Sequence, residues 1–219
     1  MKLYKKNLKK LIEYNVYKPS FEHDACGVGF IASTEGKKSR NVVEFGIQAL
    51  KAVWHRGAVD ADGKTGDGAG IHIEIPKDFF IERIENAGRM HKKGDICVGM
   101  IFLPRNDYVA QEKCKTLVEN ELLSKNYYIY RWRQVPVNTK VLGAKAESNR
   151  PEIVQLIFKS NNVNLKEDDL ERDLFIVRKK IEKLSNALKL NDFYICSLSS
   201  RSIIYKGMFL AEQLSSFYP

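Results

Sequence analysis

The sequence predicts an α+β fold, in which helices and strands form separate packed layers. Short apolar strand-like runs occur both next to one another and between long amphipathic helices, a pattern that disfavours regular βαβ alternation. With 219 residues, of which 44% are hydrophobic, the chain can bury a sizeable core and lies outside the composition of disordered proteins. No repeat or proline-rich linker divides it, so we expect one continuous domain after a short leader.

The first elements surround a glycine-rich stretch. Residues 27–32 (GVGFIA) are small and apolar, which predicts a buried strand, and residues 41–54 carry apolar side chains at helical spacing, which predicts a helix. Residues 55–70 are rich in turn formers. Residues 71–75 alternate between apolar and polar and end before a proline, which predicts a strand. The turn-rich stretch therefore joins a helix to a strand.

The middle of the chain predicts three strands and a helix. Residues 96–103 are almost wholly apolar, which is typical of a buried strand, and further strands are expected at 127–137 and 153–158. Asn106 is expected to cap the helix between the first two strands. One face of that helix carries Ala110, Cys114, Val118 and Leu122.

The last third predicts a long helix and two strands. Apolar residues recur there at alternating intervals of four and three, at Leu170, Leu174, Val177, Ile181, Leu184 and Leu188. This seam fits either a helix packed on a sheet or a short coiled coil, and the first is preferred because three heptads are the minimum for the second. Strands are expected at 193–198 and 202–205, and the short spacer between them predicts a hairpin.

The net charge of +9 invites the hypothesis of a nucleic-acid partner. Residues 1–25 account for +3 of it, with six lysines against three acidic residues. The basic cluster at 178–183 is interleaved with acidic residues, which is typical of a solvated helix face and not of a phosphate-binding stripe. We therefore expect no nucleic-acid partner.

The sequence also predicts a cytoplasmic protein that does not enter a membrane. No run reaches the ~18 uncharged apolar residues of a membrane-spanning helix. The basic start of the chain lacks the apolar stretch of a secretory signal. Four cysteines without a C-x-x-C pair indicate neither a zinc site nor a disulfide framework, so a reducing compartment is expected.

The run Gly66–Gly70 (GDGAG) looks most like a motif. Dinucleotide-binding turns open a helix, whereas a strand is expected after this run. The neighbouring aspartates suggest a calcium loop, but Lys64 and Thr65 stand where such a loop needs a ligand and a glycine. We therefore expect no metal site, and a tight turn at which the backbone approaches either another strand or a substrate.

Cys26 differs from the other cysteines of the chain. Cys97, Cys114 and Cys196 lie inside apolar elements, where a free cysteine usually behaves as a small hydrophobe. Cys26 follows a polar stretch and begins a Gly-x-Gly segment, which leaves room around its sulfur. The residues alone leave two interpretations open, a nucleophile or a structural thiol.

Several motifs in a fixed order resemble one protein family. They are EHDACGVGFIA at 22–32, HRGA at 55–58, DGKTGDGAG at 62–70, CSLSSR at 196–201, YKGM at 205–208 and EQL at 212–214. In this order they resemble the N-terminal part of the glutamate synthase large subunit, from about Tyr17 almost to the end of the chain. That part is a class II glutamine amidotransferase domain of the N-terminal-nucleophile hydrolase type.

The resemblance implies an architecture and a site. The fold would be the N-terminal portion of a four-layer α/β/β/α sandwich, with residues 1–25 as a leader and residues 26–219 as a glutaminase domain truncated at its C-terminus. Removal of the leader would make Cys26 the N-terminal nucleophile. Arg56 and Gly57 would line the substrate pocket, although Arg56 could instead pair with a loop aspartate. The pocket loop would comprise Gly66, Asp67 and Gly68.

The implied activity is release of ammonia from glutamine through a cysteine thioester, for glutamate synthesis from 2-oxoglutarate. The segment itself needs no cofactor, while FMN and an iron–sulfur cluster are implied for the full-length parent enzyme. The implied partners are glutamine, the remainder of the large subunit and a small electron-donating subunit.

Three alternatives to full activity remain open at this point. An arginine motif and an Asn-Gly pair of the family lie downstream of the matched stretch, so we expect residues 1–219 alone to show little activity. The chain could also be a class II amidotransferase that serves another acceptor. It could finally be a catalytically inactive fragment or interaction module.

Overall fold

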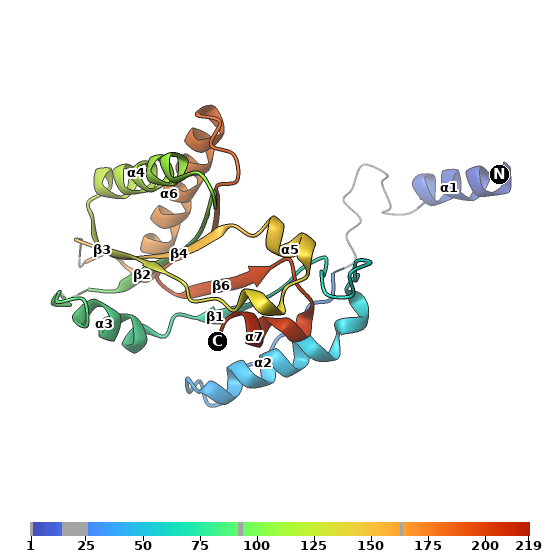
Figure 1. The fold of residues 1–219 in the computed structure, drawn as a ribbon, viewed down its shortest axis with the longest axis horizontal. Coiled ribbons are helices and arrows are strands. Elements are labelled where there is room, and N and C mark those ends of the chain that lie inside the picture. Colours follow the sequence, from blue (N-terminus) through green and yellow to red (C-terminus); the bar gives the residue numbers. More distant parts are fainter. Residues whose placement is uncertain (1, 15–25, 92–93, 163) are drawn as a thin grey trace.

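A computed structural model describes residues 2–14, 26–91, 94–162 and 164–219 and confirms the α+β class (Figure 1). The helices are α1 (Lys2–Tyr14), α2 (Arg40–Ala52), α3 (Lys77–Glu85), α4 (Tyr108–Ser124), α5 (Ala144–Ser148), α6 (Glu167–Ala187) and α7 (Leu214–Phe217). The strands are β1 (Ala69–Glu74), β2 (Ile96–Leu103), β3 (Tyr127–Gln134), β4 (Glu152–Ser160), β5 (Tyr194–Ser199) and β6 (Ser202–Gly207). Short 3-10 turns follow at Trp54–Arg56, Thr139–Val141 and Ala211–Gln213.

The strands form two antiparallel sheets. The larger sheet has the order β3-β4-β2-β5, and the smaller one pairs β1 with β6. Helices α4 and α6 cover one face of the larger sheet, the smaller sheet lies on its other face, and α2 packs beyond β1 (Figure 1). The order of layers is thus helix, sheet, sheet, helix, as the α/β/β/α prediction requires.

Strand β2 shows why the sequence forms this arrangement. Cys97 and Ile101 on one face of the strand belong to the core beneath α4 and α6, whereas Val98 and Met100 on the other face belong to the core between the sheets. A strand with two buried faces needs an almost continuous apolar run, which residues 96–103 provide. Two separate apolar clusters therefore meet across the larger sheet.

The long helix α6 packs on the sheet, as preferred from its seam. Leu170, Leu174, Val177 and Ile181 are buried in the core shared with α4, whereas Leu188 lies beyond the helix and is exposed.

The N-terminal cap of α4 differs from the prediction by one residue. The carboxylate of Asp107, and not Asn106, accepts the backbone N–H of Ala110 at 2.9 Å. An aspartate side chain serves the same capping role.

The predicted buried strand at 27–32 is wrong. This segment has no regular secondary structure, and its apolar side chains are turned to solvent, with Val28 88% and Phe30 85% exposed. An apolar run predicts burial only where a strand edge is available to pair with it. Among the described residues, β1 pairs with β6 and no strand pairs with residues 27–32.

The predicted hairpin of the last two strands is also wrong, although both strands exist. Strand β5 belongs to the larger sheet and β6 to the smaller one, so the chain crosses between layers at residues 199–201. Near this crossing, serine hydroxyl oxygens accept hydrogen bonds from backbone N–H groups. Ser199 Oγ accepts the N–H of Arg201 at 2.9 Å, and Ser197 Oγ accepts that of Ile204 at 3.2 Å. A short spacer does not distinguish a hairpin from such a crossing.

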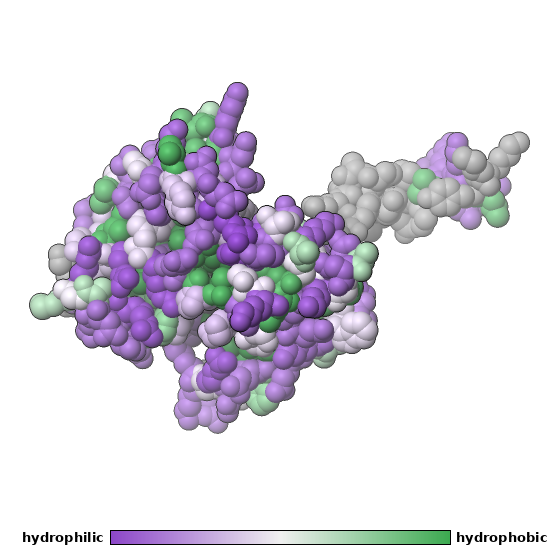
Figure 2. All heavy atoms as spheres, in the orientation of Figure 1, coloured by the Kyte–Doolittle hydropathy of each residue, from purple (hydrophilic) through white to green (hydrophobic). Residues whose placement is uncertain are grey.

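The visible surface is largely hydrophilic (Figure 2). The basic stretch 178–183 carries ion pairs, with Arg178 bound to Glu182 at 2.8 Å and Lys180 bound to Glu121 at 2.7 Å. Its positive charges are therefore partly neutralised, as expected for a solvated helix face. In the part of the chain that the structure describes, no helix is long and apolar enough to cross a membrane.

Candidate functional site

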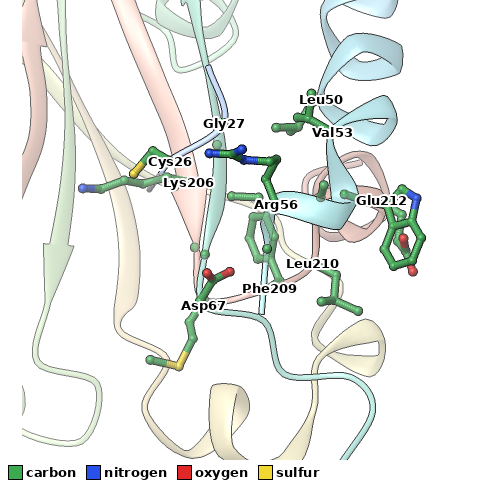
Figure 3. Close-up of a pocket in the computed structure, with 18 of the residues that line it drawn as sticks. Cys26, Gly27, Leu50, Val53, Arg56, Asp67, Lys206, Phe209, Leu210 and Glu212 are labelled. Atoms are coloured by element: carbon green, nitrogen blue, oxygen red, sulfur yellow. The ribbon is translucent and has the colours of Figure 1, made fainter. Parts of the chain in front are cut away.

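An open pocket of about 1380 Å³ lies where residues 26–27, the end of α2, the start of β1 and the segment after β6 converge (Figure 3). Cys26, Arg56, Gly57, Asp67 and Gly68 line it. These are all of the predicted site residues except one. The structure thus brings together residues from three separate sequence motifs.

Gly66 is the predicted site residue that does not line the pocket. It is buried, and a Cβ at this position would lie 2.6 Å from the carbonyl carbon and oxygen of Phe209. Glycine is required here because the turn packs backbone against backbone. Of the two interpretations of the glycine-rich turn, close approach to another segment of the chain holds at position 66, while Asp67 and Gly68 line the pocket.

Cys26 is exposed in the pocket, but it does not begin a strand as predicted. The backbone after it runs against Arg56, because a Cβ at Gly27 would lie 3.2 Å from both Cβ and Cγ of Arg56. Figure 3 shows the side chains of Cys26 and Arg56 on either side of Gly27. Cys26 and Arg56 thus line the same pocket as Asp67 and Gly68 of the glycine-rich turn.

Arg56 ends the 3-10 turn that follows α2. Its backbone N–H bonds the carbonyl of Val53 at 2.9 Å, which turns the chain toward the pocket. Among the described residues, its exposed guanidinium forms no ion pair, so the alternative of pairing with a loop aspartate is not observed. Asp60 instead pairs with Lys145 at 2.7 Å. The charge of Arg56 is available to an anionic group in the pocket.

Asp62 organises the turn that precedes the pocket residues. Its carboxylate accepts the N–H of Lys64 at 2.9 Å and both the N–H and the hydroxyl of Thr65 at 2.6 Å. These hydrogen bonds, led by the Thr65 hydroxyl, lower the pKa of Asp62 from 3.8 to about 2. The carboxylate is thus used within the turn.

The Asp62 carboxylate therefore accepts its hydrogen bonds from Lys64 and Thr65 of the same turn. In the described ranges, no group of three or more His, Cys, Asp or Glu side chains could hold a metal ion. The turn then leads into strand β1, which begins at Ala69, and not into a helix. The dinucleotide interpretation fails for the reason given by the sequence.

Two supports of the site were missed by sequence reasoning. Lys206 lines the pocket, with its Nζ 2.9 Å from the hydroxyl of Tyr194 and 4.3 Å from the centre of the ring. Gly143 packs tightly against the turn that Asp62 organises, since a Cβ at position 143 would lie 2.3 Å from Asp62 Oδ2. The YKGM motif at 205–208 could have indicated Lys206. No local sequence pattern indicates the contact between Asp62 and Gly143, which lie 81 positions apart in the chain.

The arrangement suits nucleophilic chemistry on a small polar substrate. Cys26 offers an accessible thiol, Arg56 a cation and Asp67 a carboxylate in one open pocket. The remaining three cysteines are buried, as predicted. Burial raises the pKa of Cys114 and Cys196 to about 11, which suppresses their thiolates. Only Cys26 combines exposure with pocket neighbours able to bind a charged substrate.

A family model described as class-II glutamine amidotransferases matches residues 26–219, so the match begins at Cys26. The glutamate synthase (NADPH) large chain of Azospirillum brasilense is 56% identical over 216 residues, which are 99% of this chain and 14% of that protein. The ferredoxin-dependent glutamate synthase of Pyropia yezoensis is 41% identical over 201 residues, 90% of this chain and 13% of that protein.

The glutamate synthase (NADPH) large chain of Bacillus subtilis is 36% identical over 207 residues, 93% of this chain and 13% of that protein. The chain therefore spans 14% or less of the length of these relatives. The family match covers well over half of the chain and includes every residue of the pocket. The chain belongs to the class-II glutamine amidotransferases.

Proposed function

We propose that this domain hydrolyses the side-chain amide of glutamine, with Cys26 as the nucleophile. The observation that carries the proposal is the position of Cys26, which is the first residue of the family match and lies exposed beside Arg56 in the pocket. The names of the relatives, all glutamate synthases, support glutamine as the substrate.

The reaction proceeds in two steps. The Cys26 sulfur attacks the amide carbon of glutamine, and the thiol proton passes to a base and then to the leaving nitrogen. The carbon–nitrogen bond of the tetrahedral intermediate then breaks, which releases ammonia and leaves a thioester on Cys26. Water then attacks the thioester carbon, which releases glutamate and restores the thiol. The cation of Arg56 and the carboxylate of Asp67 provide charges of the kind that bind the α-carboxylate and the α-ammonium group of an amino acid.

The base is the α-amine of Cys26 itself, which requires removal of residues 1–25. An α-amine has a reference pKa of ~7.7–8.0, so an appreciable fraction is neutral near pH 7.5 and can accept the thiol proton. Residues 15–25, including the expected cleavage point after Ala25, lie outside the described residues. Intact mass of the mature protein tests this step, because loss of the first 25 residues is expected.

In the whole protein the ammonia serves glutamate synthesis from 2-oxoglutarate. Glutamate synthases that are 36–56% identical over 93–99% of this chain support this assignment. FMN and an iron–sulfur cluster would belong to other parts of the large chain, and a small subunit would supply electrons. We place the protein in the cytoplasm, where thiols stay reduced.

Steady-state release of glutamate from glutamine tests the proposal in the polypeptide that carries this chain. Cys26→Ser should abolish glutamine-dependent turnover and leave any ammonia-dependent synthesis of glutamate intact. Cys196→Ser is a matched control, since that thiol is buried away from solvent and should not affect turnover. Turnover that survives in Cys26→Ser would refute the assignment of the nucleophile.

A further inference from the structure

The side-chain amide of Gln213 joins three segments that are far apart in the sequence. Its Nε2 donates to the carbonyl oxygen of Lys64 at 3.1 Å and to that of Val141 at 2.7 Å. Its Oε1 accepts the backbone N–H of Leu210 at 2.7 Å. Both donors of the amide and its acceptor are therefore engaged with backbone groups.

Two of these segments form separate parts of the pocket wall. Gly63 and Asp67, on either side of Lys64, line the pocket, and so do Leu210 and Glu212. Figure 3 shows Glu212 on the far side of Arg56 from Cys26. Gln213 itself does not line the pocket, so it can influence a bound molecule only through these walls.

The third segment supports the turn from outside the pocket. Val141 ends the 3-10 turn Thr139–Val141, and Gly143 after it packs against Asp62 and Thr65 with no room for a Cβ. The bonds of Gln213 to Lys64 and Val141 tie this support to the turn. The Gln213 side chain bonds only to backbone groups of these segments in the hydrogen bonds described above. Loss of these bonds should therefore loosen whole backbone segments and not a single side chain.

We propose that Gln213 is a positioning residue for substrate binding, which fixes the turn at 63–67 against the segment 210–212 and so sets the shape of the pocket. This inference rests on the proposed glutaminase function. Because Gln213 touches no reacting atom, its loss should weaken binding of glutamine more than it slows the chemistry at Cys26.

The test is Gln213→Glu, which keeps the size of the side chain and its acceptor for Leu210 but removes both donors at neutral pH. With two hydrogen bonds replaced by repulsion between oxygens, KM for glutamine should rise roughly tenfold while kcat changes less than about threefold. Steady-state glutamate release by the mature polypeptide gives both constants.

Gln111→Glu is the matched control, because Gln111 makes the same kind of contact and neither it nor its two partners line the pocket. Its Nε2 donates to the carbonyl oxygens of Pro104 at 2.8 Å and Arg105 at 3.2 Å. If Gln213→Glu acted only by weakening the fold, the two variants would raise KM alike. We expect Gln111→Glu to lower stability and leave KM unchanged.

Lowering the pH provides a rescue of Gln213→Glu. The carboxylate would face two carbonyl oxygens, which raises its pKa and favours the protonated form. A protonated carboxyl regains one donor. The ratio of KM in Gln213→Glu to KM in the wild type should therefore fall as the pH is lowered from 8 to about 6, whereas a ratio that stays constant would contradict the proposal.

Amide hydrogen exchange separates this inference from the proposed function. Exchange at residues 63–70 should accelerate in Gln213→Glu and stay unchanged in Gln111→Glu, even in a protein that fails to hydrolyse glutamine. Equal exchange in both variants would overturn the role of Gln213. Absence of wild-type glutaminase activity with accelerated exchange would instead contradict only the function of the pocket.

Discussion

At the scale of single residues, the four cysteines differ in exposure and therefore in chemistry. Cys26 is exposed, and the other three thiols lie in the cores of the sheets and of α4. Desolvation is the main reason that the pKa of Cys97 lies well above its ordinary value and that those of Cys114 and Cys196 reach about 11. Since the thiolate is the nucleophile, only Cys26 can react readily in the folded chain.

Alkylation with iodoacetamide at pH 8 should therefore modify Cys26 first. A thiol with a pKa of 11 is ionised in only about one molecule per thousand at this pH, and burial slows access further. Peptide mass mapping over time measures each site. In denaturant all four cysteines should react at similar rates, and rapid modification of Cys196 without denaturant would contradict the described packing.

Asp62 links stability to pH at the residue scale. Its pKa is about 2 in the fold against an ordinary value of 3.8, so the folded state binds its proton less readily than the unfolded state. The stabilising contribution of Asp62 is therefore fully present above about pH 4 and is lost as the pH falls toward 2.

Asp62→Asn should lower the free energy of unfolding, because the amide retains an acceptor but loses the charge that strengthens its bonds to Thr65. Urea denaturation at several pH values measures the difference from the wild type. This difference should be largest above about pH 4 and shrink toward pH 2. A difference that is independent of pH would show that the charge of Asp62 contributes nothing.

At the scale of elements, α6 fixes the crossing from β5 to β6. The carboxylate of Glu171 accepts the hydroxyl of Ser199 at 2.9 Å, and the N–H and hydroxyl of Ser200 at 2.6 and 2.7 Å. Ser199 and Ser200 are buried, so these N–H and O–H donors need the acceptor that Glu171 provides. The crossing delivers β6, and with it Lys206, to the pocket.

Glu171→Ala should cost at least about 2 kcal/mol of unfolding free energy, since it leaves buried hydroxyl and amide groups without their charged acceptor. Arg172→Ala on the next position is the control. That side chain is 71% exposed and forms a surface ion pair with Asp169, so a change within about 0.5 kcal/mol is expected. Equal effects of the two substitutions in denaturant titrations would contradict this role of Glu171.

Periodicity predicted most elements because it reflects burial directly. Strand β2 and the seam of α6 are covered on the faces that the sequence indicates. The strand at 27–32 and the hairpin failed because pairing depends on which edge lies nearby, and this is set by the whole fold. Helix α4 is capped by Asp107 and not by the predicted Asn106. This is a one-residue difference between two neighbouring residues that can both cap a helix.

At the scale of the whole molecule, a buried amide connects the two sheets. Gln155 of β4 has no exposed surface, its Oε1 accepts Arg133 Nη1 at 2.7 Å, and its Nε2 donates to the Tyr205 hydroxyl on β6 at 3.1 Å. Burial lowers the pKa of Arg133 and raises that of Tyr205. The link spans the core between the layers.

Gln155→Leu should destabilise the protein by about 2–3 kcal/mol, because it removes a hydrogen-bond partner from the partly buried guanidinium of Arg133 and from the partly buried hydroxyl of Tyr205. Gln134→Leu is the control, since Gln134 is exposed on the same sheet and its side-chain amide donates to the carboxylate of Glu152 at 2.6 Å. A change within about 0.5 kcal/mol is expected for it. Thermal unfolding of both variants measures the contrast.

The site was predictable only as far as its motifs extend. Cys26, Arg56 and Asp67 stand in short runs that the sequence displays, and the fold brings those runs together. The contacts of Gln213 and Gly143 join positions distant in the chain, and no spacing rule reveals them. The resemblance to glutamate synthase supplied the layer order, which periodicity alone left open.

The most direct test of the central claim is covalent trapping of the nucleophile. The mature polypeptide is incubated with a glutamine analogue that carries an electrophile in place of the side-chain amide, and the adduct is mapped by mass spectrometry. We predict one adduct per chain, on Cys26, that excess glutamine prevents. An adduct on another residue, or labelling of Cys26 that glutamine does not slow, would contradict the assignment of this pocket as a glutaminase site.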